Sequence, residues 1–368
     1  MKKQLLVYGA GAIGRGYVPW VFPPDEFDLT YVEENDSLRE KLNKQKQFTS
    51  YCTKNGAYQK LVVPISNCIK PGDELSSINN YMGIVTAVGP RQVLSLKDNF
   101  QKADCPIVLF ENDSSLSVQL NHLTGKSNIY FGVPDVITSN TAPKELLDQD
   151  ELSIVTEDGV CFIEEGAKSL GGINDYVSKE ELHKQWMAKL YIHNTPHCIA
   201  AYLGALQGKQ YLHEGMSNPA IYALVEGAMN EMRDMVVKKY NLDQEFVDWY
   251  AKKELGRFAN VILYDPIIRV AREPFRKLAL DNRLIGAAQL ALSMGIVPEF
   301  LIKGILAAFL YNKENDADFN ITTLMNALSP DNFLKLIINL STHDALYKCI
   351  MTRWDNTLDE LKGLQNDN

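Results

Sequence analysis

The stretch QLLVYGAGAIG at residues 4–14 decides the fold class, because a short apolar strand runs directly into three glycines. Gly9, Gly11 and Gly14 have the spacing GxGxxG, which permits a tight turn and lets the backbone approach a pyrophosphate closely. This pattern predicts a dinucleotide-binding domain of the Rossmann type, although a glycine-rich turn in another α/β fold is the alternative. The residues predicted to form the binding loop are Gly9, Ala10, Gly11, Ala12, Ile13 and Gly14.

Glu33 is predicted to select the cofactor. It follows a second apolar strand, FDLTYV at residues 27–32, at the place where a dinucleotide fold needs an acid. Its carboxylate can accept hydrogen bonds from ribose hydroxyls and would repel the extra phosphate of NADP. Glu34 is adjacent and no arginine lies beside the pair in the sequence, so the predicted cofactor is NAD. Pro19 predicts that the first helix is short or kinked.

Near-continuous apolar runs continue the α/β alternation and predict more strands of a buried parallel sheet. They cover residues 60–66, 83–89, 105–112 and 127–134. Open α/β sheets bind ligands at the carboxyl ends of their strands, so Thr86, Ala87 and Val88 are predicted to lie under the nicotinamide. Asn112 would face the reacting carbon, or it could instead cap the next helix. Residues 151–166 predict a hairpin that turns at residues 157–159.

The sequence changes character near residue 180, where long amphipathic segments begin. Helices are predicted at residues 180–192, 197–207, 218–240, 244–258, 274–293, 297–311, 330–339 and 341–365. A chain of 368 residues exceeds one typical core, so two domains are expected. The predicted fold class is α/β, with an N-terminal Rossmann-type doubly wound sheet at residues 1–180 and an all-helical C-terminal substrate domain at residues 181–368.

The composition limits the classes of partner. A net charge of -9 and a pI near 5.3 argue against a nucleic acid, since phosphate backbones select basic surfaces. The six cysteines have no metal-binding spacing, and the sequence holds no run of about 18 apolar residues, so neither a metal nor a membrane anchor is predicted. The expectation is a cytoplasmic monomer or homodimer with a small-molecule partner.

The stretch KLYIHNTPH, which begins at Lys189, is the predicted catalytic centre. In one continuous helix Asn194 would lie about 140° round from Lys189 and His197 about 80°, so the three side chains could share a face. Pro196 instead favours a new helix that Thr195 caps. Taken alone, these residues could also be a solvated lysine with two polar loop or capping groups.

The stretch RVAREPFRKL is a predicted anion site. Pro274 can open a helix with Arg272 before it and with Arg276 and Lys277 in its first turn, so that cations and helix amides would meet. The alternative is a solvated basic helix start that pairs with nearby acids, Glu273 and Asp281.

Five stretches together resemble the polyol-specific long-chain dehydrogenases. GAGAIGRG, VTAVGP, the asparagine of FEN, KLYIHNTPHCIAAYLG and REPFRKLALDNRL occur in the order and near the spacing found in the mannitol-1-phosphate 5-dehydrogenases of that family. The resemblance runs from residue 1 to at least residue 300, and its K-x4-N-x2-H signature falls on Lys189, Asn194 and His197. Pro196 stands where the family usually has glycine. The resemblance implies an NAD-dependent oxidoreductase that uses no metal.

The resemblance also implies a role for each site residue. A neutral Lys189, its pKa lowered by burial between the domains, would take the proton of the alcohol. Asn112 and Asn194 would donate hydrogen bonds to the developing alkoxide, and His197 would hold the substrate. Asp135 resembles an acidic position that lines the family's polar cleft.

The implied reaction is the interconversion of D-mannitol 1-phosphate and D-fructose 6-phosphate, with Arg272, Arg276 and Lys277 offsetting the charge of the phosphate. A hexuronate reductase of the same superfamily is an alternative, because a carboxylate could use the same cations. A catalytically silent NAD-binding sensor is a more remote one. The presence of a lysine, two asparagines and a histidine at the family's positions argues against the sensor.

Overall fold

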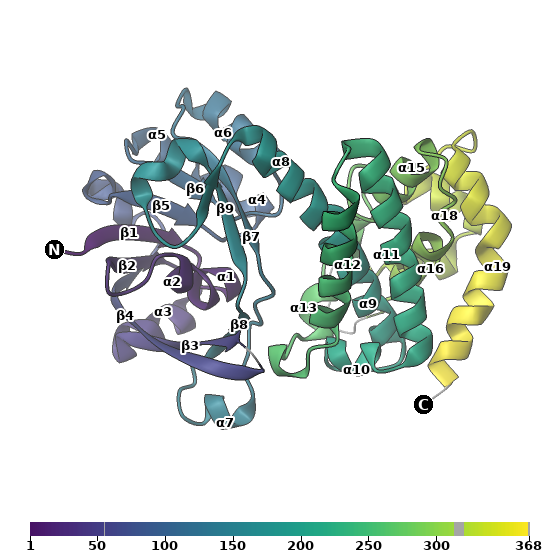
Figure 1. Ribbon diagram of the computed structural model, residues 1–368, viewed down its shortest axis with the longest axis horizontal. Helices are drawn as coiled ribbons and strands as arrows, with labels where there is room; N and C mark the ends of the chain where they lie inside the picture. The colour runs from purple at the N-terminus through teal and green to yellow at the C-terminus, as the bar shows by residue number, and fades with distance from the viewer. Residues whose placement is uncertain (55, 313–319, 367–368) are drawn as a thin grey trace. The chain divides into compact units, whose positions relative to one another are not determined.

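The computed structural model describes residues 1–54, 56–312 and 320–366. It divides into two compact units: unit 1 comprises Met1–Trp186 and Ile262–Tyr264, and unit 2 comprises Met187–Val261 and Asp265–Asn368. Unit 1 holds the sheet, drawn in purple to teal in Figure 1, and unit 2 is helical. The predicted fold class, a Rossmann-type α/β domain followed by an all-helical domain, is therefore confirmed.

One ten-stranded sheet organises unit 1, in the order β10-β9-β7-β6-β5-β1-β2-β4-β3-β8. Its central strands run parallel, whereas β3 pairs antiparallel with β4 and β9 pairs antiparallel with β7. The bounds of the strands are β1 Lys3–Tyr8, β2 Phe27–Val32, β3 Gln47–Lys54, β4 Ala57–Ile69, β5 Gly83–Thr86, β6 Ile107–Leu109, β7 Ile129–Asp135, β8 Ile154–Glu157, β9 Val160–Glu164 and β10 Asp175–Val177.

Both faces of the sheet are buried, which explains the near-continuous apolar runs. Along β1, Leu5 and Val7 belong to one buried cluster, and Leu6 and Tyr8 belong to another on the opposite face. The helices and 3₁₀ turns of this unit are α1 Ala12–Gly16, α2 Val18–Val21, α3 Asp36–Gln45, η1 Asp73–Ser76, η2 Ile78–Asn80, α4 Pro90–Val93, η3 Leu94–Leu96, α5 Lys97–Lys102, α6 Ser115–Thr124, α7 Lys144–Leu147 and η4 Glu165–Leu170. The first helix is short, as Pro19 predicted: α1 has five residues and α2, with Pro19 in its first turn, has four.

The hairpin predicted at residues 151–166 is wrong. The strand β8 pairs with β3, and β9 pairs with β7 and β10, so the two strands diverge instead of pairing with each other. A Cβ on Gly159 would lie 2.6 Å from the Asp135 carbonyl oxygen, so this glycine permits a close approach between the turn and β7. The prediction of a purely parallel sheet is also incomplete, because it missed the antiparallel strand β3.

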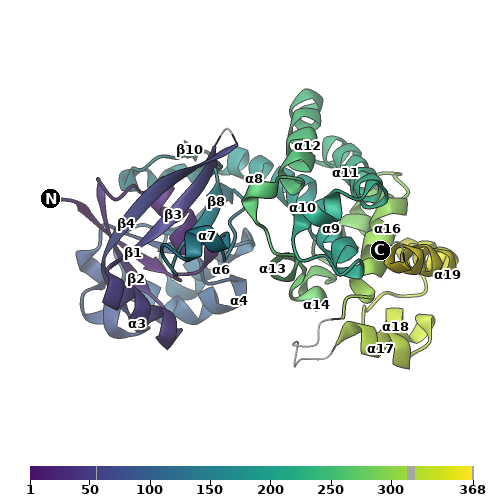
Figure 2. The ribbon, with the colours of Figure 1, turned by 90° about the horizontal axis from the view of Figure 1, so that it is seen from below.

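The helix α9 (Thr195–Leu206) forms the centre of unit 2 (Figures 1 and 2), where it packs against α10, α11, α13 and α16. Its residues from Thr195 to Gly204 are buried on every side. The other helices from residue 179 onward are α8 Lys179–Ala188, a π-helix Lys189–Asn194, α10 Leu212–Met216, α11 Pro219–Tyr240, α12 Gln244–Phe258, η6 Val261–Leu263, α13 Ile267–Ala271, α14 Pro274–Lys277, α15 Ile285–Ser293, α16 Glu299–Phe309, α17 Ile321–Ala327, α18 Pro330–Leu336 and α19 Ala345–Asn366. In the described part of the chain, no helix combines the length and apolar character needed to span a membrane.

The helix predicted at residues 274–293 is broken in two. The Asn282 side chain accepts a hydrogen bond from the Arg283 amide at 2.9 Å, a local bond that competes with helical hydrogen bonding. The Leu284 amide donates to the Lys277 carbonyl at 3.2 Å and closes the connection between α14 and α15. This hydrogen bond brings the end of α14 next to the start of α15.

The α16 helix takes its N-terminal cap from another helix. Its N-cap residue is Pro298, which has no capping side chain. Glu231 of α11 supplies the missing acceptor, because its carboxylate accepts from the amides of Phe300 at 2.7 Å and Leu301 at 2.9 Å. Burial raises the pKa of Glu231 to about 7, against the opposing effect of these hydrogen bonds.

Replacing Glu231 tests this cap. Glu231→Ala leaves two amide donors without their acceptor and should lower the free energy of unfolding by about 1–3 kcal/mol in urea denaturation. Because the pKa of Glu231 is raised from 4.5 to about 7 on folding, its stabilising effect is complete below pH 4.5 and is lost as the pH rises through 7. Glu231→Gln keeps an acceptor but cannot ionise, so this loss should disappear; an unchanged pH dependence would contradict the assignment.

Candidate functional site

The loop after β1 contains three glycines, and packing within the protein excludes a side chain at two of them but not at the third. Gly9 has a φ of +93°, and a Cβ there would lie 2.6 Å from the Ala87 carbonyl oxygen. A Cβ on Gly14 would collide with the Gly9 carbonyl oxygen. At Gly11, in contrast, a Cβ would meet no described atom within 4 Å. The bare backbone at Gly11 thus leaves open space, as the second glycine of a pyrophosphate-binding loop does.

The loop is held from two sides. The Glu33 carboxylate accepts from the Ala10 amide at 2.8 Å, which links the end of β2 to the glycine turn. Arg15 is buried, and its guanidinium donates to the carbonyl oxygens of Ala10 at 2.6 Å and Leu152 at 2.7 Å. Arg39, which sequence reasoning overlooked, donates to the Glu33 carbonyl at 3.0 Å. An arginine therefore does lie beside Glu33 in space, where it also forms an ion pair with Asp36.

Glu111 fixes the segment predicted to lie under the nicotinamide. This buried carboxylate accepts from the Thr86 hydroxyl at 2.9 Å and from the amides of Val88 at 3.0 Å and Gly89 at 2.8 Å. Burial raises the pKa of Glu111, while the three hydrogen bonds act in the opposite direction. The Ala87 amide donates to the Tyr8 carbonyl at 2.8 Å. The sequence contains Glu111 in the FEN triplet, but its partners are 22 to 25 residues away and were not predicted.

Asn112 does not cap the following helix. The N-cap of α6 is Ser114, and Asp113 Oδ1 accepts from the Ser115 amide at 2.9 Å. The Asn112 side chain is exposed and makes no hydrogen bond with another described residue. The alternative interpretation of Asn112 as a capping residue is therefore wrong. Asp135, the acidic residue that the resemblance places in a polar cleft, is buried at the end of β7.

The predicted catalytic stretch contains a π-helix at Lys189–Asn194, which passes into α9 without leaving helical backbone angles. Thr195 has helical angles, so of the two geometries that the sequence left open, the new helix capped by Thr195 is wrong. A proline within an α-helix clashes with the carbonyl four residues earlier, and the wider π turn before Pro196 relieves that clash. The π-helix bonds residues five positions apart, and Lys189 and Asn194 are separated by five. They therefore lie on the same face, one turn apart.

Lys189, Asn194 and His197 are all buried, which excludes the interpretation of Lys189 as a solvated surface residue. Asn194 Nδ2 has no hydrogen-bond partner among the described residues. A buried donor without an acceptor costs about 1–3 kcal/mol, so its presence is typical of a site that offers the donor to a ligand.

Asp265 holds the imidazole of His197. His197 Nε2 lies 2.9 Å from Asp265 Oδ2, and Arg269 donates to the other carboxylate oxygen at 2.6 and 2.9 Å. Burial acts to raise the pKa of Asp265, but Arg269 and His197 outweigh it and hold that pKa below its usual value. Burial lowers the pKa of His197 to about 4. A neutral His197 thus donates from Nε2 to an ionised Asp265 and keeps Nδ1 as an acceptor.

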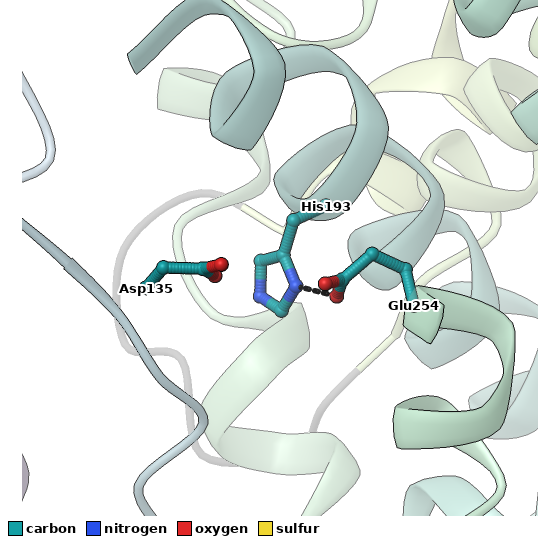
Figure 3. Close-up of side chains that lie close together, drawn as sticks. All are labelled: Asp135, His193 and Glu254. Carbon is teal, nitrogen blue, oxygen red and sulfur yellow. Dashed lines mark hydrogen bonds and ion pairs between the residues drawn. The ribbon is translucent and has the colours of Figure 1, made fainter. Parts of the chain in front are cut away.

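His193 is a second buried histidine that sequence reasoning missed, although it lies inside the KLYIHNTPH stretch. Figure 3 shows its Nδ1 directed at the carboxylate of Glu254, which also forms an ion pair with Arg257. The rings of His193 and His197 are 4.9 Å apart, and Phe258 stacks on His197 with 5.0 Å between centroids. Residues from α12 therefore contact both imidazoles, of which His193 comes from the π-helix and His197 from the first turn of α9.

The predicted anion-binding residues have different environments. Arg272 is exposed, and Arg276 pairs with Glu273 at 2.9 Å, the surface pairing that the sequence left open. Lys277 is buried, donates to the Arg272 carbonyl, and lies 5.9 Å from the centre of the Tyr202 ring. The helix α14 begins at Pro274 as predicted but has only four residues, so its dipole contributes little.

Comparison with known proteins places both parts of the chain in one family. Residues 3–108 match the mannitol dehydrogenase Rossmann domain, and residues 181–332 match the mannitol dehydrogenase C-terminal domain. The mannitol-1-phosphate 5-dehydrogenase of Geobacillus stearothermophilus is 30% identical over 338 residues, covering 84% of this chain and 88% of that protein. That of Bacillus pumilus (strain SAFR-032) is 29% identical over 372 residues, covering 95% and 98%.

Solved structures share the fold at lower identity. The ternary complex of Pseudomonas fluorescens mannitol 2-dehydrogenase with NAD and D-mannitol aligns with a TM-score of 0.76 at 15% identity, covering all of this chain and 95% of that one. A D-sorbitol dehydrogenase aligns with a TM-score of 0.63 at 13% identity, covering 99% and 92%. These structures share the fold, and the two domain matches together with the relative that is 30% identical show that the chain belongs to the mannitol dehydrogenase family of NAD-dependent oxidoreductases.

Proposed function

We propose that the chain interconverts D-mannitol 1-phosphate and D-fructose 6-phosphate, with NAD as cofactor and Lys189 as the general base. The observation that carries this proposal is the burial of Lys189, Asn194 and His197 along one π-helix and the start of α9. Relatives named mannitol-1-phosphate 5-dehydrogenase, 26–30% identical to this chain, support the choice of substrate.

In the oxidation direction, Lys189 accepts the proton of the C5 hydroxyl. A lysine can do so only as a neutral amine, and Lys189 is buried at 6% exposure. Bound NAD supplies the hydride acceptor for C5. The Asn194 amide, one π turn from Lys189, donates to the oxygen as negative charge develops on it. For Asn112 the same donor role stays a prediction.

His197 orients the substrate in this proposal. Its Nδ1 accepts a hydrogen bond from a substrate hydroxyl, because Asp265 occupies Nε2 and burial keeps the ring neutral. Neither His197 nor Asp265 needs to change protonation during turnover. Their joint function is to keep one acceptor at a fixed place beside Asn194 and Lys189.

A substrate panel separates this function from its alternatives. D-fructose 6-phosphate, D-fructose, tagaturonate and fructuronate are each assayed as oxidants of NADH. The proposal expects the highest kcat/KM with D-fructose 6-phosphate. Preference for either hexuronate would identify a hexuronate reductase, and turnover with none of them would favour a non-catalytic sensor.

Lys189→Ala tests the general base. Loss of a positioned base should lower kcat by about 10² or more, while the affinity for NADH, measured by fluorescence titration, is retained. Added primary amines should restore part of the rate, because they can accept the same proton. Lys184→Ala, at a half-buried lysine of α8 that pairs with Glu180, serves as the control. Near-normal turnover by Lys189→Ala would show that the base lies elsewhere.

Asp265→Asn tests the orientation of His197. An asparagine amide can donate to Nε2, which would move the ring proton to Nδ1 and remove the acceptor that the substrate uses. The kcat/KM should fall on the order of 10- to 100-fold, the scale of a charge-assisted hydrogen bond, with NADH affinity unchanged. Asp281→Asn, at an exposed acid of the same unit, is the matched control. An Asp265→Asn variant with wild-type kcat/KM would refute this arrangement.

Glu33 tests the cofactor. The wild type should use NAD in strong preference to NADP, because the carboxylate repels a 2′-phosphate. Glu33→Ala and Glu33→Gln should both narrow the ratio of the two kcat/KM values. Glu33→Gln separates charge from support, since its amide oxygen can still accept from the Ala10 amide. Equal use of NADP by the wild type would contradict the prediction.

A further inference from the structure

Arg283 is a buried arginine for which the described residues supply no carboxylate partner. Only 8% of its surface is exposed. Among the described residues, the side-chain contact of its guanidinium is one hydrogen bond, from Nε to Asn282 Oδ1 at 3.3 Å. A buried charge lowers the stability of the folded state unless an opposite charge or hydrogen bonds offset its loss of water. An arginine presents five donors in a planar fork that suits carboxylate and phosphate oxygens, and most of this fork is unused.

The surroundings of Arg283 are positively charged and contain a second unsatisfied polar group. The charge of Arg283 acts on Lys277, which is buried and has its ammonium 5.9 Å from the centre of the Tyr202 ring. Tyr202 is fully buried, and its hydroxyl has no hydrogen-bond partner among the described residues. Burial lowers the pKa of both Lys277 and Arg283, with further lowering from Arg276. The carboxylate that acts on this group, Glu273, is already paired with Arg276.

The segment from Lys277 to Arg283 lies directly against the catalytic helix. The Thr195 hydroxyl is 2.9 Å from the Arg283 carbonyl oxygen, so Arg283 adjoins the residue that follows Asn194. Thr195 and Tyr202 are seven residues apart on α9 and share a face. The positive charge of Arg283 acts on the thiol of Cys198. Cys198 lies about 6 Å from Asn194 along the helix axis, because the two are four residues apart. An extended six-carbon chain bridges that distance.

We propose that Arg283, assisted by Lys277 and the Tyr202 hydroxyl, forms the anion subsite that binds the phosphate of the substrate. This inference rests on the proposed function. It differs from the expectation that Arg272, Arg276 and Lys277 carry the phosphate, because it keeps only Lys277 of the three. Arg276 already has Glu273 as its partner, and Arg272 is exposed, so neither gains as much from an added anion. Arg283 gains a partner for a charge that no carboxylate among the described residues offsets directly.

Kinetics with and without the phosphate test the subsite. Arg283→Gln should raise the KM for D-fructose 6-phosphate by about 10- to 100-fold, the scale of a lost charge-assisted hydrogen bond, without changing the slower reduction of D-fructose. Arg276→Gln should have a smaller effect. Arg233→Gln, at an arginine of α11 paired with Asp234, is the matched control for both. Equal losses with both ketoses, or a larger effect of Arg276→Gln, would overturn the proposal.

Inorganic phosphate tests the subsite independently of the reaction. In thermal unfolding at constant ionic strength, phosphate should raise the Tm of the wild type and of Arg233→Gln but not that of Arg283→Gln. Should Arg283→Gln fail to fold, Arg283→Lys takes its place, with a reduced shift because lysine lacks the planar fork. Tyr202→Phe should also reduce the shift. An equal shift in wild type, Arg283 variants and Tyr202→Phe would overturn the subsite.

The two assays fail in different ways. A wild type that does not reduce D-fructose 6-phosphate but shows the phosphate shift at Arg283 would refute the proposed function and retain the anion site. A wild type that reduces D-fructose 6-phosphate with no loss in Arg283→Gln would refute the subsite and retain the function.

Discussion

The proposed catalytic stretch, Lys189 to His197, depends on the π turn that precedes Pro196. Proline deprives the helix of one amide donor and crowds the preceding turn, so an ordinary α-helix could not continue through this position without a kink. The wider turn at Lys189–Asn194 removes the crowding and changes which side chains align. Residues five apart meet on one face, and that is the spacing between Lys189 and Asn194. A backbone irregularity enforced by one proline thus sets the geometry of the proposed base and the proposed alkoxide donor.

The irregular turn needs support from distant parts of unit 2. The Thr195 hydroxyl reaches the carbonyls of Leu190 at 3.1 Å and Arg283 at 2.9 Å, which ties the turn to the connection before α15. Glu254 and Asp265 each hold one imidazole of the stretch. These carboxylates are buried, so each would be costly without its histidine and arginine partners. The contacts that position the proposed catalytic side chains are therefore also contacts that stabilise the fold.

The success of sequence-based prediction followed the range of the interactions involved. The glycine loop, Glu33 and the short first helix were predictable because a turn, a strand end and a proline act locally. The pairing of β8 with β3 was not, because the choice of strand partner is settled by the whole sheet. Asp265 lies 68 residues from His197, and no local pattern connects them. The π-helix was also missed. Its signal in the sequence is the proline at position 196, and a proline there fits a kinked helix or the start of a new helix equally well.

Each unit contains a feature that the packing of the chain itself does not explain and that a bound ligand would. Gly9 and Gly14 are glycines because the protein itself would collide with a side chain, whereas at Gly11 only open space remains. The Asn194 amide is likewise a buried donor that the described residues leave unpaired. A residue that lowers the stability of the fold, with no compensating contact within it, is expected to contact a ligand. The same reasoning, applied to a buried guanidinium in a protein of net charge -9, is what separates Arg283 from the paired arginine seven residues before it.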